Sequence, residues 1–96
     1  MVDHLVFFAV REDVADEDVE DLLSSVRDLR NSVGSVVDFS VGEDFSGRAG
    51  DYTHALFARF EDRDGLQEYL EHPDHLAVVE KLGERTTGRI VADYEF

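Results

Sequence analysis

The candidate proton-transfer residues in this chain of 96 residues are its four histidines, one of its three tyrosines and one of its aspartates. They are His4, His54, His72, His75, Tyr69 and Asp93. An imidazole takes up or releases a proton near neutral pH, and a phenol hydroxyl can polarise a carbonyl by a hydrogen bond. A carboxylate next to the imidazole would orient its ring. Together these groups could take a proton from carbon while polarising a carbonyl.

Two other interpretations of the histidines stay open. Buried imidazoles can be structural, because they satisfy backbone carbonyls, and His72, directly before Pro73, could cap a helix. A metal site is the second alternative, since His72 and His75 are three positions apart and neutral imidazole is a common metal ligand. Such a site needs three ligands in a defined geometry. We expect a capping His72 to point differently from His75, so no metal is assigned.

The spacing of apolar residues predicts four strands and two or three helices. The first strand is apolar on both faces, which indicates that both faces are covered. Asp16 is the expected cap of the first helix, Gly34 its expected end, and Asp62 the expected cap of the second. Pro73 is expected to open a further helix. The predicted order is strand 4–10, helix 16–33, strand 36–43, loop 46–50, strand 52–60, a short helix from 62, helix 73–82 and strand 88–96.

This order predicts one α+β domain over residues 1–96, a ferredoxin-like β-α-β-β-α(α)-β unit. Its usual sheet is antiparallel, in the order 4-1-3-2, with helices on one face. The first and third strands are expected to be central and parallel to each other, so that His4 and His54 begin at the same end. The helix after the third strand would return His72 and His75 to that end, and the last strand would bring Asp93 there. All four histidines are therefore expected to converge on one end of the sheet.

Alternation along the strands predicts what each face of the sheet does. The face with His4 and His54 should pack on the helices, so a pocket is expected between helices and sheet. The opposite face would be bare in a monomer, which soluble proteins avoid, and a homodimer with sheet packed on sheet would cover it. The expected pocket walls are Val6, Phe8, Leu23, Val26, Leu56 and Val79, and the expected dimer face carries Leu5, Phe7, Ala55 and Phe57.

The net charge of −14 excludes some classes of partner. Phosphates repel such a chain, and no segment concentrates Lys or Arg, so neither nucleic acid nor an anionic membrane is expected. No apolar run is long enough to span a membrane, and the N-terminus lacks the basic region of a signal peptide. The absence of Cys excludes a disulfide scaffold and favours the cytosol. An excess of Asp over Glu, with Arg in place of Lys, is typical of salt-adapted organisms, so a cytoplasmic, halophilic protein is expected.

Four segments carry a resemblance to a known family. They are residues 3–8 (DHLVFF), 52–56 (YTHAL), 69–75 (YLEHPDH) and 91–94 (VADY). Together they resemble the stress-responsive A/B barrel (Dabb) family, across nearly the whole chain. The resemblance implies a dimeric α+β barrel, in a family where most members have no established reaction. In one plant branch, a cofactor-free polyketide cyclase, it implies that Tyr69 and His75 are the catalytic pair, with His4, His54 and Asp93 around them.

Two functions follow from these observations. The first is a small dimeric protein of unassigned reaction that binds a small organic ligand in a pocket lined by His and Tyr. The second is a cofactor-free lyase or polyketide-cyclase-like enzyme, or more remotely a cofactor-free monooxygenase. In it His75 would be the base, Tyr69 would donate a hydrogen bond to a carbonyl, and His4, His54, His72 and Asp93 would line or orient the site. Neither function requires a cofactor.

Overall fold

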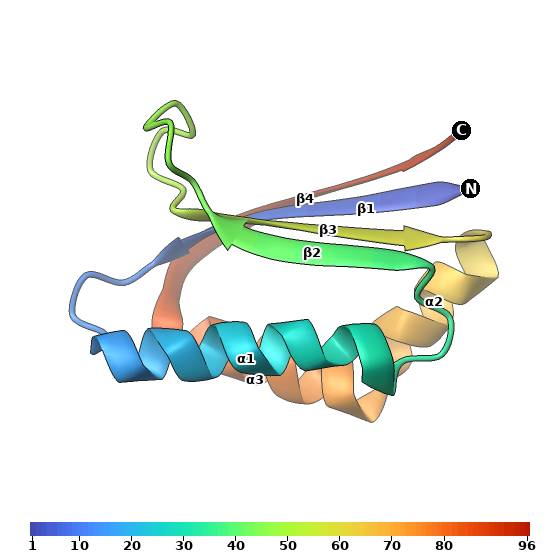
Figure 1. The fold of residues 1–96 in the computed structure, drawn as a ribbon, viewed down its shortest axis with the longest axis horizontal. Helices are drawn as coiled ribbons and strands as arrows, with labels where there is room; N and C mark the ends of the chain where they lie inside the picture. Colours follow the sequence, from blue (N-terminus) through green and yellow to red (C-terminus); the bar gives the residue numbers. More distant parts are fainter.

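The computed structural model describes residues 1–96 as a four-stranded sheet with all helices on one side (Figure 1). The strands are in the order β2-β3-β1-β4, which is the ferredoxin-like order 4-1-3-2 counted from the other edge. The predicted fold class is therefore confirmed. The elements are β1 (Val2–Val10), α1 (Asp16–Ser32), β2 (Asp38–Glu43), β3 (His54–Phe60), α2 (Arg63–Glu71), α3 (Pro73–Arg85) and β4 (Thr86–Glu95).

The two central strands, β1 and β3, run antiparallel, so the expectation that they are parallel is wrong. Helix α1 carries the chain from β1 to β2 in the same direction, and β3 then returns by a hairpin between them. As a result Phe8 pairs with His54, and His4 pairs with Ala58. Four positions along a strand correspond to roughly 13 Å. His54 therefore lies at the opposite end of the sheet from His4, and the four histidines do not converge.

Two of the three predicted helix starts are confirmed. The Asp62 carboxylate accepts a hydrogen bond from the Gly65 N–H at 2.8 Å and caps α2, and Pro73 is the first residue of α3. The expected cap of α1, Asp16, is instead its first helical residue, after an extended Ala15 that has no capping side chain. Its charge still lies in the first turn, where the helix dipole favours a carboxylate.

The core lies between the helices and one face of the sheet. Val6 and Phe8 of β1 face the helices, as the alternation predicted, and pack in a single cluster with the buried side of α1. Helix α1 packs against β2 and α3, while α2 and α3 also contact β1 and β4. The cluster comprises Val2, Val6, Phe8, Leu22, Leu23, Val26, Leu29, Val33, Phe39, Leu56, Ala58, Phe60, Leu66, Tyr69, Val78 and Leu82.

No helix covers the other face of the sheet, the upper face in Figure 1. Phe7 is 43% exposed there, and Ile90, its partner in β4, is 52% exposed. The same face carries one polar cluster, in which the Arg59 guanidinium donates two hydrogen bonds to Asp3, at 2.7 and 3.0 Å. The Tyr94 hydroxyl donates a third to Asp3, at 3.1 Å. This open sheet face is thus apolar apart from an internally paired polar cluster at the end where β1 begins.

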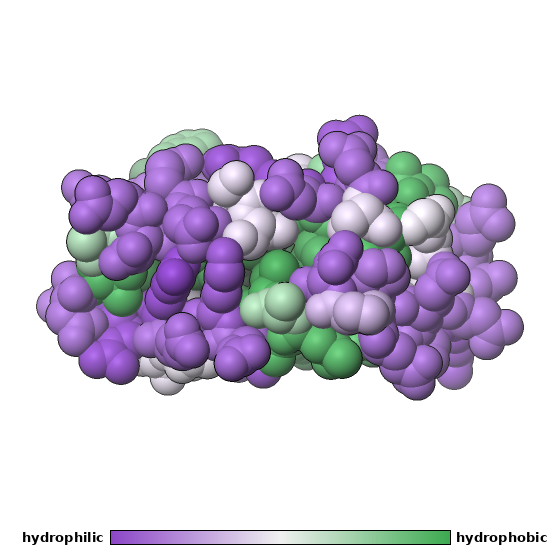
Figure 2. Space-filling model, turned by 90° about the horizontal axis from the view of Figure 1, so that it is seen from below, coloured by the Kyte–Doolittle hydropathy of each residue, from purple (hydrophilic) through white to green (hydrophobic).

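The opposite, helix-bearing face is mainly hydrophilic, with smaller hydrophobic areas between the polar side chains (Figure 2). Acidic side chains such as Asp16, Glu17 and Asp18 lie on the exposed sides of the helices. None of the three helices has both the length and the apolar character needed to cross a membrane.

Candidate functional site

A pocket of about 250 Å³ lies between α2 and α3 on one side and β1 and β4 on the other. Its walls combine five aliphatic side chains with two imidazoles, a carboxylate and a guanidinium. Apolar walls with a few convergent polar groups are typical of a small-molecule site. The lining residues are His4, Val6, Leu70, His75, Val79, Leu82, Arg89, Val91 and Asp93.

The break between α2 and α3 positions His75. Pro73 keeps His72 extended, which ends α2 and lets α3 start in a new direction with His75 in its first turn. The His75 Nδ1 lies 3.1 Å from the carbonyl oxygen of Leu70. A carbonyl only accepts hydrogen bonds, so Nδ1 must carry the proton, and in the neutral ring Nε2 is left with a free lone pair.

Burial lowers the pKa of His75, and the nearby His4, Arg89 and His72 lower it further, while the hydrogen bond to Leu70 opposes them. The imidazole is therefore neutral at pH 7. The chain has no fully buried side-chain nitrogen or oxygen without a partner. Since Nε2 has no protein partner, it retains contact with solvent at the pocket. A neutral imidazole with an accessible Nε2 can accept a hydrogen bond or a proton.

A second imidazole, His4, borders the pocket from β1. Its Nδ1 hydrogen-bonds to the carboxylate of Asp93, the residue directly opposite it in β4. The carboxylate accepts this bond, so it fixes the ring and leaves Nε2 as the free nitrogen. Asp93 thus orients an imidazole, and the antiparallel pairing of β1 with β4 is what brings the two together.

Tyr69 lies behind the two imidazoles and does not line the pocket. Its ring centroid is 4.4 Å from that of His75, 5.8 Å from that of His4 and 5.1 Å from that of Phe60. Burial raises the pKa of Tyr69, so its hydroxyl stays protonated as a donor. That hydroxyl has no protein partner and is not sealed from solvent, because no fully buried polar atom lacks a partner. The Tyr69 ring connects His4 to His75 by packing.

The whole chain matches a single family model, described as the stress responsive A/B barrel domain (Dabb), over residues 2–96. The chain belongs to the Dabb family. The resemblance seen in the four sequence segments is thereby confirmed. Within this Dabb domain, His4 of the first segment pairs with Asp93 in the sheet. His75 of the YLEHPDH segment lies over this pair, in the first turn of α3, and His72 is the residue before that helix.

Three similar proteins show how far the likeness extends. An uncharacterized protein of Streptomyces coelicolor is 35% identical over the full length of both chains. A solved dimeric protein of unknown function and ferredoxin-like fold from Bacteroides fragilis is 27% identical, with a TM-score of 0.83, over 99% of this chain and 95% of that chain. A hydroxynitrile lyase from Passiflora edulis has a TM-score of 0.89 at 18% identity, over 97% of this chain and 90% of that chain. This last likeness shows the fold alone.

Two of the four histidines of this Dabb domain lie outside the pocket. His54 stacks on Phe8, with ring centroids 5.2 Å apart, and its Nδ1 lies 2.7 Å from the Thr53 hydroxyl at the far end of β3. His72 caps α3, because its Nδ1 accepts a hydrogen bond from the Asp74 N–H at 3.1 Å. The pocket lies over β1 and β4, away from much of α1. Four expected wall residues therefore belong to the core and do not border it: Phe8, Leu23, Val26 and Leu56.

The expected pocket residues did not include four that line the pocket in the structure: Leu70, Leu82, Arg89 and Val91. The pairing of β4 with β1 explains two of them. Arg89 stands opposite Phe8, and Val91 stands opposite Val6, so both are on the helix side of the sheet. Alternation counted back from Asp93 along the last strand would have indicated both residues.

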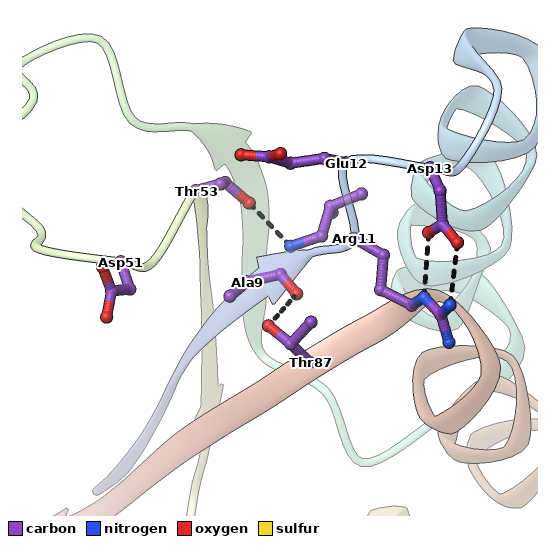
Figure 3. Close-up of a pocket in the computed structure, with 8 residues that line it drawn as sticks. Ala9, Arg11, Glu12, Asp13, Asp51, Thr53 and Thr87 are labelled. Carbon is purple, nitrogen blue, oxygen red and sulfur yellow. Dashed lines mark hydrogen bonds and ion pairs between the residues drawn. The ribbon is translucent and has the colours of Figure 1, made fainter.

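A larger, more polar hollow of about 540 Å³ lies at the other end of the sheet, around the end of β1 (Figure 3). Its polar groups are mostly paired with one another. Arg11 donates to both oxygens of Asp13, at 2.9 and 2.8 Å, and Thr53 accepts from the backbone N–H of Val10 at 3.0 Å (Figure 3). With only Ala9 and Val10 as apolar walls, this hollow offers a ligand little to bury against. The pocket beside His75 is the better candidate site.

Proposed function

We propose that this Dabb domain binds a small organic ligand in the pocket beside His75. The observation that carries the proposal is the free Nε2 of a neutral imidazole at the edge of a largely aliphatic pocket of about 250 Å³. Burial of an apolar ligand surface against Val79 and Leu82 would supply most of the affinity. A hydrogen bond to Nε2 would supply orientation.

The state of His75 restricts the kind of ligand group that can meet it. Nε2 is an acceptor, so a ligand that carries a donor, such as a hydroxyl or an amide N–H, can bond to it directly. The Tyr69 hydroxyl is a donor without a protein partner, but it lies behind the imidazoles and does not border the pocket, so it is not part of the proposed ligand contact. The proposed ligand is therefore a small, largely apolar molecule, oriented by a donor group where it carries one.

The proposal includes a homodimer through the open sheet face, with Leu5, Phe7, Ala55 and Phe57 in the contact. Two observations support it. The face is apolar and no helix covers it (Figure 1), and the related Bacteroides fragilis protein is described as dimeric. The pocket lies on the helix side of the sheet, so such a dimer would leave it accessible.

A titration with octanamide, followed by amide NMR spectra of the ¹⁵N-labelled protein, tests the ligand site. Octanamide offers an N–H donor next to a carbonyl, with an aliphatic chain. We expect saturable shifts confined to residues around the pocket, and a clear loss of affinity in His75→Ala. His54→Ala is the matched control, since it removes a buried imidazole at the other end of the sheet and should leave binding unchanged. Shifts that do not saturate, or an equal loss in both variants, would contradict the proposal.

The second candidate function is a cofactor-free lyase or cyclase at the same site. It is favoured by the free Nε2 of the neutral His75 imidazole at the pocket, and by the fold shared with a hydroxynitrile lyase. In this mechanism Nε2 of His75 takes the hydroxyl proton of a cyanohydrin, the bond to the nitrile carbon breaks, and cyanide leaves with the bonding electron pair. The proton then passes from His75 to the departing cyanide, which leaves as hydrogen cyanide, and the imidazole is neutral again.

Cleavage of mandelonitrile, measured as benzaldehyde absorbance, tests this second candidate. Under the lyase mechanism His75→Ala abolishes turnover, while His54→Ala, at an imidazole outside the pocket, leaves it unchanged. Release of benzaldehyde at the uncatalysed rate by the wild-type protein would count against a hydroxynitrile lyase activity.

A further inference from the structure

We propose that Arg89 makes the pocket selective for ligands that carry a carboxylate group. This inference rests on the proposed ligand-binding function and specifies its ligand class. The ligand would be a small amphipathic monocarboxylate, with its apolar chain against the aliphatic walls and its carboxylate on the Arg89 guanidinium.

Arg89 is one of three Lys and Arg side chains of the chain that form no ion pair, and of these three it is the one that lines the pocket. Six of the nine Lys and Arg side chains form ion pairs with Asp or Glu. The paired cations are Arg11, Arg27, Arg59, Arg63, Lys81 and Arg85. In a chain with 23 acidic residues, a cation left unpaired at a pocket is available for an external anion.

The carboxylate in the same pocket does not neutralise Arg89. Asp93 is bonded to His4, and it stands four positions from Arg89 on the same side of β4. Four positions in a strand correspond to roughly 13 Å. The pocket is therefore cationic at the Arg89 end and occupied by the His4–Asp93 pair at the other, so an anionic ligand has one favourable orientation.

The chemistry of the two ends matches one class of ligand. A guanidinium presents two parallel N–H donors to a carboxylate, a pairing stronger than a neutral hydrogen bond. Between the ends, Val6, Val79 and Leu82 offer an aliphatic surface. A neutral ligand would gain the apolar contacts but not the charge-assisted pair.

Calorimetric titration with octanoate and octanamide tests this inference, because the two probes match in shape and differ in charge. For the wild-type protein we expect octanoate to bind roughly tenfold more tightly than octanamide. Arg89→Gln should remove this preference by weakening octanoate binding roughly tenfold, while Arg89→Lys should retain part of it. Arg48→Gln is the control, since it removes the same charge from an unpaired arginine on the 46–50 loop, away from the pocket.

The outcomes separate the two proposals. Equal affinity for both probes, unchanged in Arg89→Gln, would overturn carboxylate selection while the ligand pocket stands. If Arg48→Gln lowers the preference for octanoate as much as Arg89→Gln does, the preference comes from net charge. This result would also overturn carboxylate selection by Arg89. Binding of neither probe would contradict the ligand-binding function itself.

Discussion

At the scale of single residues, the account depends on the protonation state of His75. Its Nδ1 donates to the Leu70 carbonyl, which leaves Nε2 as an acceptor, and burial lowers its pKa. His54 is the other imidazole with a lowered pKa, again because of burial, although the charge of Glu43 opposes the effect. Both rings are therefore neutral in the folded protein at pH 7, but only His75 borders the candidate site.

The lowered pKa of His75 predicts how stability depends on pH. An unfolded histidine binds a proton near pH 6.5, but the folded state resists this proton until the pH is lower. The stabilisation is thus fully present above pH 6.5 and is lost as the pH falls through the lowered pKa of the folded state. We expect the urea midpoint to fall between pH 7.5 and pH 5, and to fall less in His75→Gln, which cannot titrate. Identical pH profiles for the two proteins would show that His75 is not shifted.

At the scale of elements, the sequence predicted which segments form helices and strands better than it predicted their directions. Apolar alternation identified all four strands, and Asp62 and Pro73 marked two helix starts. The error concerned β1 and β3, whose relative direction follows from the hairpin between β2 and β3 and not from local pattern. That error placed His54 in the site, whereas His4, His75 and Asp93 were grouped correctly because they lie on or over the β1–β4 pair.

A pocket between helices and sheet was expected, but several of its walls could not be predicted from the sequence, for a related reason. Whether a side chain such as Leu23 enters the core or lines a cavity depends on how α1 and α3 divide the sheet between them. Residue types and spacing indicate which side of a helix is buried, but they do not show where two neighbouring elements leave a cavity. Alternation along β4 places Arg89 on the same side of the sheet as Asp93, but it does not show the cavity that both residues line.

The two helix starts predict a measurable difference in capping. Asp62→Ala removes the side chain that accepts from Gly65, so we expect a loss of about 1 kcal/mol in the free energy of unfolding. Asp16→Ala removes only a favourable charge from the first turn of α1, so a smaller loss is expected. Urea denaturation of the two variants at pH 7 measures the difference. A larger loss for Asp16→Ala would show that the cap of α1 is misplaced.

At the scale of the whole molecule, the open sheet face predicts the oligomeric state. A carboxylate at Phe7 would place a charge within the proposed dimer contact, so Phe7→Asp is expected to be monomeric in light scattering after gel filtration. Leu76→Asp is the matched control, because Leu76 is 55% exposed on α3, on the helix side of the molecule. If both variants elute as the wild type does, the contact lies elsewhere.

The net charge predicts a dependence of stability on salt. At −14 the folded chain repels itself, and molar salt shortens the Debye length to about 3 Å, which screens that repulsion. Surface ion pairs such as Arg11–Asp13 weaken at the same time, but exposed pairs contribute little. We expect the melting temperature to rise steeply between 0.05 M and 2 M KCl. An unchanged midpoint would contradict the proposed adaptation to a salty solvent.

The central claim is that the pocket between α2, α3, β1 and β4 holds a small organic molecule against His75. A crystal structure of the protein with octanamide tests it most directly. The account predicts density in this pocket, with the ligand amide within hydrogen-bond distance of Nε2 of His75 and the chain against Val79 and Leu82. A pocket closed by packed side chains, or ligand density only in the polar hollow around Arg11, would contradict the claim.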